Sequence, residues 1–236
     1  MMLPNVNEVE FYTTIPSTKQ KIKYRPFTVK QQKALLFARE SGETMDIINA
    51  VCNVLQEVVV DQIKVRELAS FDIEYLFLQI RGKSIGENVE FKLKHFHNPE
   101  CNKSNELMMN IDDIQVTFPD GQDNKIQLND QYGVVLKYPT LEALDNIDLT
   151  DNIESNLKFI SNSIEMVYDN DKVYDDFNSA EAYEFLMTLS PTQFQKIVRF
   201  YQNLPFVSTT ITYTCKHCNQ EDTIRFKGLA DFFMLG

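Results

Sequence analysis

The chain has 236 residues, of which 43% are hydrophobic and 24% are charged, and it contains 17 Phe and 10 Tyr but no Trp. A chain of this length buries roughly 70% of the surface that its unfolded form exposes, so it needs no disulfide or metal merely to fold. Its formal net charge of -11 argues against non-specific binding to nucleic acid or to an anionic membrane, because both require a basic surface.

Targeting signals and spanning helices are not expected. Met1–Tyr12 has no basic segment followed by an apolar one, and no run approaches the ~18 apolar residues of a membrane span. Without a secretory signal, the thiols of Cys52, Cys101, Cys215 and Cys218 should stay reduced. A Cys-x-x-Cys pair in that setting indicates metal or redox chemistry.

Residues 1–86 are predicted to form an extended segment followed by a helical unit. Residues 9–24 are β-branched and aromatic, which favours extended structure. Apolar residues then recur at helical spacing in three runs, at residues 29–41, 44–60 and 70–82, the last one ending at Arg81-Gly82.

Residues 87–138 are predicted to be β-rich. Val89, Phe91, Leu93 and His95 alternate with polar residues, as in a half-buried strand, and a turn-rich segment follows. Further short strands are expected at about residues 106–111, 114–118, 125–128 and 133–138.

Residues 139–205 are predicted to be helical, and residues 206–236 to form a hairpin with an apolar tail. Helices are expected at about residues 152–168, 179–189 and 191–203, with an acidic loop at 169–178. The final strands, 207–214 and 221–226, flank Cys215-Lys216-His217-Cys218. The predicted fold class is therefore α+β. An N-terminal helical unit joins central and C-terminal β-hairpins that form a zinc-ribbon-like element, with an inserted helical segment, all in one compact domain.

The Cys-x-x-Cys pair predicts a structural zinc site. A hairpin tip that presents two thiolates has the form of a zinc knuckle, and a structural zinc requires four ligands. The turn after His95 is a second tip of the same kind. We predict a site made of His97, Cys101, Cys215 and Cys218, with His95 as the alternative fourth ligand.

Two other interpretations of these cysteines stay open. A thioredoxin-type redox pair would lie at a helix N-terminus, which lowers the thiol pKa. Alternatively, the cysteines are small reduced hydrophobic residues without a ligand. Cys52 falls on the apolar stripe of a helix and is expected in the core, whereas His217 is expected to face solvent. The acidic loop lacks the Gly and the twelfth-position Glu of a calcium loop.

Four blocks of sequence resemble the baseplate protein family of T4-type phages, which includes a baseplate hub subunit and a baseplate hub assembly catalyst. They are KYRPFTVKQQKALL at 23–36, FDIEYLFLQIRGKSIGE at 71–87, VVLKYPT at 134–140, and ITYTCKHC at 211–218 followed by FKGLADFF at 226–233. The resemblance extends from about residue 21 to the C-terminus.

The resemblance implies a late phage protein, without enzymatic activity, that is made in the host cytoplasm and helps to assemble the hub of the tail baseplate. Its partners would be other hub proteins. Whether it remains in the virion or acts transiently like a chaperone stays open. The apolar tail at 229–235 is expected either to fold back on the core or to contact a partner.

Two other classes of function compete with this interpretation. One is a metal- or thiol-dependent enzyme of unknown substrate. The other is a zinc-ribbon module that binds nucleic acid, which the acidic Glu221 and Asp222 beside the knuckle disfavour.

Overall fold

The computed structural model describes residues 9–95, 100–101, 103–145, 153–228 and 231, and its contacts group the chain into two compact units. The first unit comprises residues 1–66, 71–117 and 206–236, and the second comprises residues 67–70 and 118–205. The four segments defined from the sequence were expected to share one domain, whereas here the chain leaves the first unit and returns to it at Phe206. The architecture is α+β, as predicted. Among the described residues, no helix is long and apolar enough to cross a membrane.

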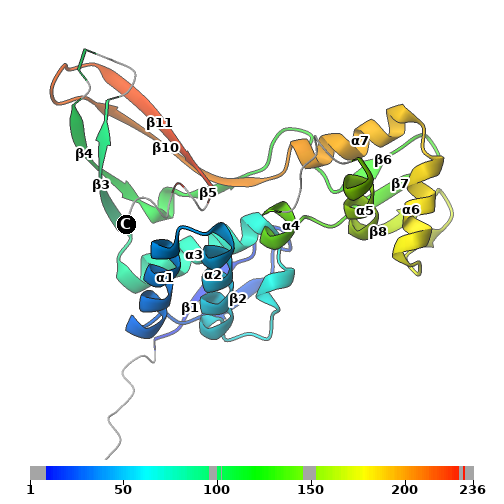
Figure 1. Cartoon of the computed structure of the whole chain (residues 1–236), viewed down its shortest axis with the longest axis horizontal. Helices are drawn as coiled ribbons and strands as arrows, with labels where there is room; N and C mark the ends of the chain where they lie inside the picture. Colours follow the sequence, from blue (N-terminus) through cyan, green and yellow to red (C-terminus); the bar gives the residue numbers. More distant parts are fainter. Residues whose placement is uncertain (1–8, 96–99, 102, 146–152, 229–230, 232–236) are drawn as a thin grey trace, which may run out of the picture. The chain divides into compact units, whose positions relative to one another are not determined.

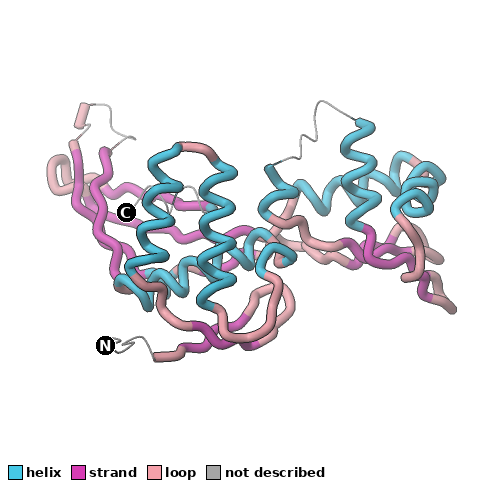
Figure 2. The backbone as a smooth tube through the Cα atoms, turned by 60° about the horizontal axis from the view of Figure 1, so that its bottom comes forward, coloured by secondary structure: helices cyan, strands magenta, loops and turns pink. Residues whose placement is uncertain are grey.

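The N-terminal part of the first unit is a β-hairpin followed by helices. Helices α1 and α2 lie side by side, as Figure 2 shows, and α1 ends at Gly42, whose φ of 74° is in the left-handed region that glycine favours. The elements are β1 (Phe11–Thr14), β2 (Lys21–Tyr24), α1 (Val29–Ser41), α2 (Thr44–Val58), the 3-10 turn η1 (Val65–Glu67) and α3 (Ser70–Ile85).

A buried carboxylate attaches this hairpin to α3. Asp72 is fully buried, and its two oxygens accept hydrogen bonds from the backbone N–H of Ser17 (2.9 Å) and from the Ser17 hydroxyl. Ile15 and Ile22 of the same hairpin are both at most 1% exposed. The hairpin is therefore part of the core of this unit.

Helix α3 continues past the predicted stop at Gly82 and ends at Ile85. Gly82 is buried, and a Cβ added there would lie 3.4 Å from Cγ2 of Ile111. Gly82 thus packs on Ile111 within the helix, and it is not the helix terminator that the sequence suggested.

The rest of the first unit consists of two long antiparallel hairpins whose tips converge (Figure 1). The rings of Phe91 and Phe226 pack edge to face, with centroids 5.3 Å apart, and join the inward faces of the hairpins. The elements are β3 (Asn88–Lys94), β4 (Ser104–Asn110), the 3-10 turn η2 (Ile111–Asp113), β5 (Gln115–Thr117), β10 (Phe206–Thr214) and β11 (Glu221–Lys227). Strands β11, β10 and β5 form one sheet in that order, and β3 pairs with β4.

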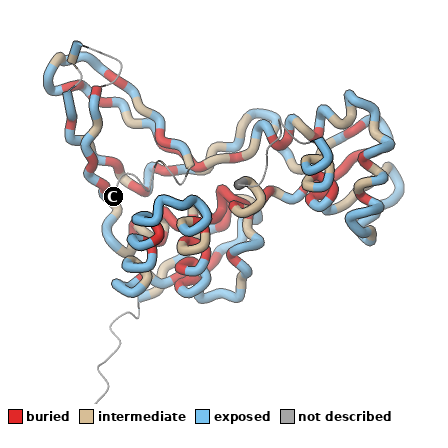
Figure 3. The backbone as a smooth tube through the Cα atoms, in the orientation of Figure 1, coloured by how far each residue is buried: buried red, intermediate tan, exposed pale blue. Residues whose placement is uncertain are grey.

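The second unit packs helices on a four-stranded sheet of order β6-β7-β8-β9. Its core, drawn red in Figure 3, includes Val134, Leu136, Ile160, Ile197 and Phe200. Capping boxes start α6 and α7, as the sequence predicted for α6. The elements are β6 (Lys125–Gln127), β7 (Gly133–Leu136), α4 (Leu141–Asp145), α5 (Ile153–Ser163), β8 (Ile164–Tyr168), β9 (Val173–Tyr174), α6 (Ser179–Thr188) and α7 (Pro191–Gln202).

The helix predicted over 152–168 is wrong in its last five residues. Helix α5 ends at Ser163, and residues 164–168 form β8, which pairs with β7 and β9. The buried strand β7 needs a hydrogen-bonding partner on this side, and the Ile, Val and Tyr of β8 suit a strand. Strand β9 lies within the predicted acidic loop.

A buried tyrosine in the second unit gives the first testable prediction. Tyr201 hydrogen bonds to the hydroxyl of Ser163, which itself donates to the carbonyl of Ile160 (2.8 Å), and burial raises the pKa of Tyr201 to about 12. We expect Tyr201→Phe to lower the free energy of unfolding by about 1 kcal/mol near neutral pH.

The pH dependence provides the control. Because the folded pKa exceeds the unfolded value of about 10, the tyrosine's contribution is complete below pH 10 and is lost as the pH rises towards 12. Urea titrations between pH 8 and 12 should show that the difference between wild type and Tyr201→Phe shrinks in this range. A difference that does not depend on pH would contradict the assignment.

Candidate metal centre

The tips of the two long hairpins bring four potential metal ligands together. His95 directly follows β3, Cys101 lies in the turn before β4, and Cys215 and Cys218 lie in the turn between β10 and β11. One ligand atom from each residue lies within 4.8 Å of all the others. Residues more than 100 positions apart in sequence thus form one cluster.

The turn that holds Cys215 and Cys218 is built by its own backbone. The N–H of Cys215 donates to the carbonyl of Gln220 (2.8 Å), and the N–H of Asn219 donates to the carbonyl of Cys215 (2.9 Å). Asn219 has a φ of 58°, a conformation that asparagine tolerates better than most residues. The cysteine pair is therefore at a hairpin tip and not at the helix N-terminus of a thioredoxin-type site.

Two of the separations are close to those of a tetrahedral metal site. The sulfurs of Cys101 and Cys215 are 3.7 Å apart, and Nδ1 of His95 is 3.3 Å from the sulfur of Cys218. Ordinary zinc bond lengths place two tetrahedral sulfurs about 3.8 Å apart, and a sulfur and a nitrogen about 3.6 Å apart. All four cysteines of the chain are free thiols. Three thiols and one imidazole at these separations could bind a metal ion.

A buried asparagine joins the two tips beside the cluster. Asn105 on β4 is 2% exposed. Its amide nitrogen donates to the sulfur of Cys215 (3.4 Å), and its oxygen accepts from the backbone N–H of Lys216 (3.0 Å). The ring of His217 adds a contact between Nε2 and the carbonyl of Ser104 (3.1 Å). The tips are thus held together by direct hydrogen bonds as well as by their proximity.

A second buried carboxylate orients the histidine. Nε2 of His95 lies 3.5 Å from Oδ2 of Asp222, and the two side chains are 3% and 6% exposed. The tautomer that carries its proton on Nε2 directs that proton towards Asp222 and leaves Nδ1, which faces the thiols, with the free lone pair that a metal requires. Carboxylate–histidine pairs of this kind fix the ring orientation of metal ligands.

Asp222 is itself held in place. Its oxygens accept from the hydroxyl of Tyr213 (3.3 Å) and from the backbone N–H of Thr223 (2.8 Å). Burial, together with the negative charge of Asp222, raises the pKa of Tyr213 to about 12, so that hydroxyl stays protonated and able to donate.

The thiols differ in acidity. Burial acts to raise the pKa of Cys215, but hydrogen bonds from the backbone of His217 and Cys218, from Asn105 and from the Cys218 thiol outweigh it and lower the pKa to about 5. The backbone of Lys103 acts to lower the pKa of Cys101, yet burial and the two other thiols raise it above its ordinary value. Cys215 is therefore a thiolate at neutral pH, the form that binds metal.

Three of the four predicted ligands, Cys101, Cys215 and Cys218, meet in the structure. His97 lies outside the described residues, whereas its predicted alternative, His95, lies inside the cluster. Cys52 is buried in α2, and His217 is exposed apart from its contact with Ser104. The apolar tail at 229–235 lies largely outside the described residues.

Two supporting residues, Asn105 and Asp222, were not predicted. The sequence does contain a signal for Asp222, because on β11 it alternates in step with Ile224 and Phe226 and therefore faces the same, inward side. A carboxylate at a core-facing position needs a buried partner. Asn105 likewise faces the same, inward side of β4 as Met109.

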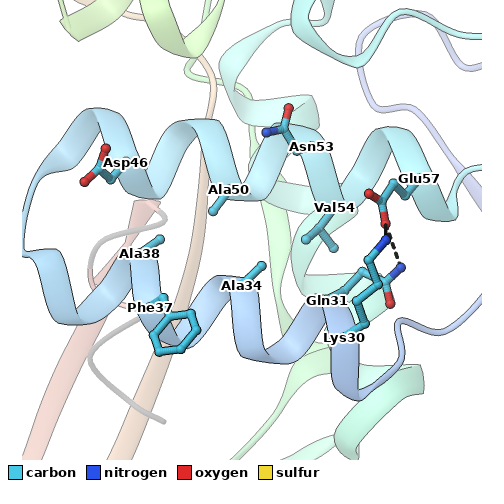
Figure 4. Close-up of a pocket in the computed structure, with 10 residues that line it drawn as sticks. All are labelled: Lys30, Gln31, Ala34, Phe37, Ala38, Asp46, Ala50, Asn53, Val54 and Glu57. Carbon is cyan, nitrogen blue, oxygen red and sulfur yellow. Dashed lines mark hydrogen bonds and ion pairs between the residues drawn. The ribbon is translucent and has the colours of Figure 1, made fainter.

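A separate hollow of about 480 Å³ lies between α1 and α2 (Figure 4). Ala34, Ala38 and Ala50 line its middle, and Phe37 lies at its edge on the α1 side with 59% of its surface exposed. At one end Glu57 accepts from Gln31 (2.8 Å) and pairs with Lys30 (3.6 Å). This hollow is a surface between small side chains, with an exposed aromatic ring on its rim.

These features define an α+β protein whose two hairpins meet at a three-cysteine, one-histidine cluster. The model of the T4 bacteriophage base plate protein family matches residues 7–234, nearly the whole chain. The chain therefore belongs to the T4 bacteriophage base plate protein family, and this membership supports a structural role in the baseplate of the phage tail. No curated protein and no solved structure matches it.

The cluster predicts a metal-dependent fold in the first unit. Cys215→Ser should abolish stoichiometric metal binding and lower the melting temperature, because the binding energy of a structural metal is folding energy. Elemental analysis and thermal melts of the purified protein measure both effects. Cys52→Ala, at a buried cysteine outside the cluster, is the control and should keep its metal. Unchanged metal content in Cys215→Ser would contradict the site.

The carboxylate behind His95 gives a separate prediction. Asp222→Asn keeps the size of the side chain and the acceptor for Thr223, but removes the charge that orients His95. We expect metal affinity to fall by about 10–100-fold, measured by competition with a chromogenic chelator. Glu221→Gln removes the exposed neighbouring charge and should leave the affinity unchanged. Equal losses in both variants would indicate a general charge effect.

Proposed function

We propose that this protein is a structural or assembly component of the baseplate hub of a T4-like phage. It binds neighbouring hub proteins and catalyses no reaction. The observation that carries the proposal is the family match over residues 7–234. Assembly takes place in the host cytoplasm, and the protein reaches the tail baseplate together with its partners.

The exposed face of α1 supports a role in protein binding. Phe37 is 59% exposed and borders the hollow between α1 and α2, whereas Val29 and Leu36, 80% and 42% exposed, lie on another side of the helix. A large apolar side chain exposed beside a hollow is typical of protein contact sites. An aromatic ring such as that of Phe37 is the kind of residue that dominates binding energy in an interface.

In this proposal the metal is a structural zinc that holds the hairpins together. Thiolate and imidazole ligands favour zinc over hard cations such as calcium and magnesium. Four protein ligands fill a tetrahedral zinc and leave no open position for substrate. The ion would therefore support the shape of the binding surfaces and take no part in chemistry.

The test is co-expression of the full chain with each of the other baseplate proteins of the same phage, followed by affinity purification and size exclusion. We expect co-elution with at least one of them. Phe37→Ser should weaken that complex by roughly tenfold or more without lowering thermal stability, because the ring is mostly exposed.

Met187→Ser is the matched control, since Met187 is 58% exposed but lies on α6 in the second unit. It should leave the complex intact. Failure of the wild-type chain to associate with any baseplate protein would overturn the proposal. Equal loss in both variants would remove α1 as the contact surface.

A further inference from the structure

Strand β10 has a long open edge. Strand β11 pairs with it from Ser208 to Thr214 on one side, but β5 pairs only with Phe206–Ser208 on the other. Beyond Ser208, no strand of the described residues pairs with this second side. The open stretch, Thr209–Thr214, runs from the end of β5 to the metal cluster and has the length of an ordinary strand of about 5–6 residues.

The hydrogen-bonding groups on this edge can be assigned. The N–H of Cys215 donates to the carbonyl of Gln220, so this pair is a hydrogen-bonded one. Hydrogen-bonded and non-hydrogen-bonded pairs alternate along an antiparallel ladder. Thr210, Thr212 and Thr214 therefore direct their N–H and C=O groups away from β11. Ser208 has the same parity, and it is the residue that pairs with Gln115 of β5. A new strand on this edge would continue the line that β5 begins.

The distribution of charged residues among the strands indicates that a partner covers the open edge of β10. Natural proteins protect exposed edges with charged residues, especially lysine. The outer strands follow this rule, since β11 carries Glu221, Arg225 and Lys227, and β3 carries Glu90, Lys92 and Lys94. Strand β10 carries no charged residue, and its sequence Ser-Thr-Thr-Ile-Thr-Tyr-Thr at 208–214 has high β-propensity. An unprotected edge of this kind is a template for strand addition.

The open edge borders a groove. A hollow of about 640 Å³ lies between β10 and β4, and Met108, 61% exposed, stands on the β4 side. Hydroxyl and amide side chains dominate the lining, and Asp113 and Arg225 are its two opposite charges. In a chain with a net charge of -11, this nearly neutral groove matches an uncharged occupant, because a charged segment would lose hydration without gaining a partner.

We propose that an extended, uncharged segment of another baseplate protein adds a strand to β10 along Thr209–Thr214, in the groove beside β4. The inference rests on the proposed function, because the segment belongs to a neighbouring baseplate protein. Backbone hydrogen bonds to Thr210, Thr212 and Thr214 supply the affinity, as in other cases of β-strand addition. A second copy of this chain is disfavoured as the occupant, since it would bring a further charge of -11.

The test uses two proline variants at one register position. Thr212 of β10 and Thr223 of β11 face each other, both are exposed, and their hydroxyls are 3.1 Å apart. Each directs its N–H away from the other strand, so Thr212→Pro removes a donor from the proposed docking edge and Thr223→Pro removes one from the opposite edge. Both variants lose the same hydroxyl pair, and the Thr223 variant also loses its N–H bond to Asp222.

The probe is the baseplate protein that co-purifies with the wild-type chain. We expect Thr212→Pro to weaken the complex at least about tenfold and Thr223→Pro to leave it within about twofold, since only the first removes a backbone donor from the docking edge and leaves an acceptor of the added strand without a partner. Hydrogen exchange by NMR should show new protection of the Thr210, Thr212 and Thr214 amides in the wild-type complex. Metal content and thermal melts check that each variant is folded. Thr212→Lys and Thr223→Lys replace the prolines if either variant is not.

The outcomes separate this inference from the function that it rests on. If a complex forms but tolerates Thr212→Pro, or leaves the three amides unprotected, the strand-addition site is wrong while the hub-binding role stands. If the isolated chain shows protection that depends on its own concentration, the occupant is a second copy and the proposal is overturned. If no baseplate protein binds the wild type, both the function and this inference fall.

Discussion

The joining of two hairpin tips is the constraint on which the β-rich half of the first unit depends. Strands β3 and β4 form one two-stranded element, and β10 and β11 belong to a separate small sheet. Two-stranded hairpins are marginal on their own in water. Here Phe91 packs on Phe226 between them, and the cluster of His95, Cys101, Cys215 and Cys218 closes their far ends. Both contacts join segments that are more than 100 residues apart.

The turn itself does not need a metal. The β1–β2 hairpin has the same backbone pattern without any cysteine: the N–H of Ile15 donates to Gln20 (2.8 Å), the N–H of Lys19 donates to Ile15 (2.9 Å), and Lys19 has a φ of 60°. There the Ser17–Asp72 hydrogen bonds hold the turn against the protein. The second turn would therefore not need a metal for its conformation. The metal would attach this turn to the other hairpin, as Asp72 attaches the first turn to α3.

Local patterns in the sequence predicted most of the elements. Helical spacing and caps located α1, α2, α6 and α7, and alternation located β3, because these signals depend on neighbours a few residues apart. The failures come from tertiary context. Ile164–Tyr168 extends an apolar helical pattern yet pairs with β7, and Gly82 lies inside α3, where it packs on Ile111. Nor does any local pattern show that the chain returns to its first unit at Phe206.

The candidate metal site likewise has residues that local patterns predicted and residues that depend on tertiary contacts. The cysteines were predictable because Cys-x-x-Cys at a hairpin tip is itself a chemical pattern, and Cys101 lies in a matching turn. The sequence left open whether His95 or His97 is the fourth ligand, because the two residues are two positions apart and would face the same side of an extended strand. The structure ends β3 at Lys94, directly before His95. Asn105 and Asp222 could be recognised only as polar residues at inward positions, and their partners become visible once the two hairpins meet.

The burial of Asp222 explains why the cluster is an ordered element and not a chance meeting of thiols. A carboxylate that is 6% exposed is costly unless its oxygens are satisfied, and it receives a hydroxyl, a backbone N–H and the imidazole edge. The hydroxyl and the N–H belong to the same hairpin as Asp222, and the imidazole of His95, 3.5 Å away, is the contact that the carboxylate gains when the tips are together. Separation of the tips would leave Asn105 and Asp222 without their partners on the other hairpin, and the cluster and its polar surroundings therefore form or open as one unit.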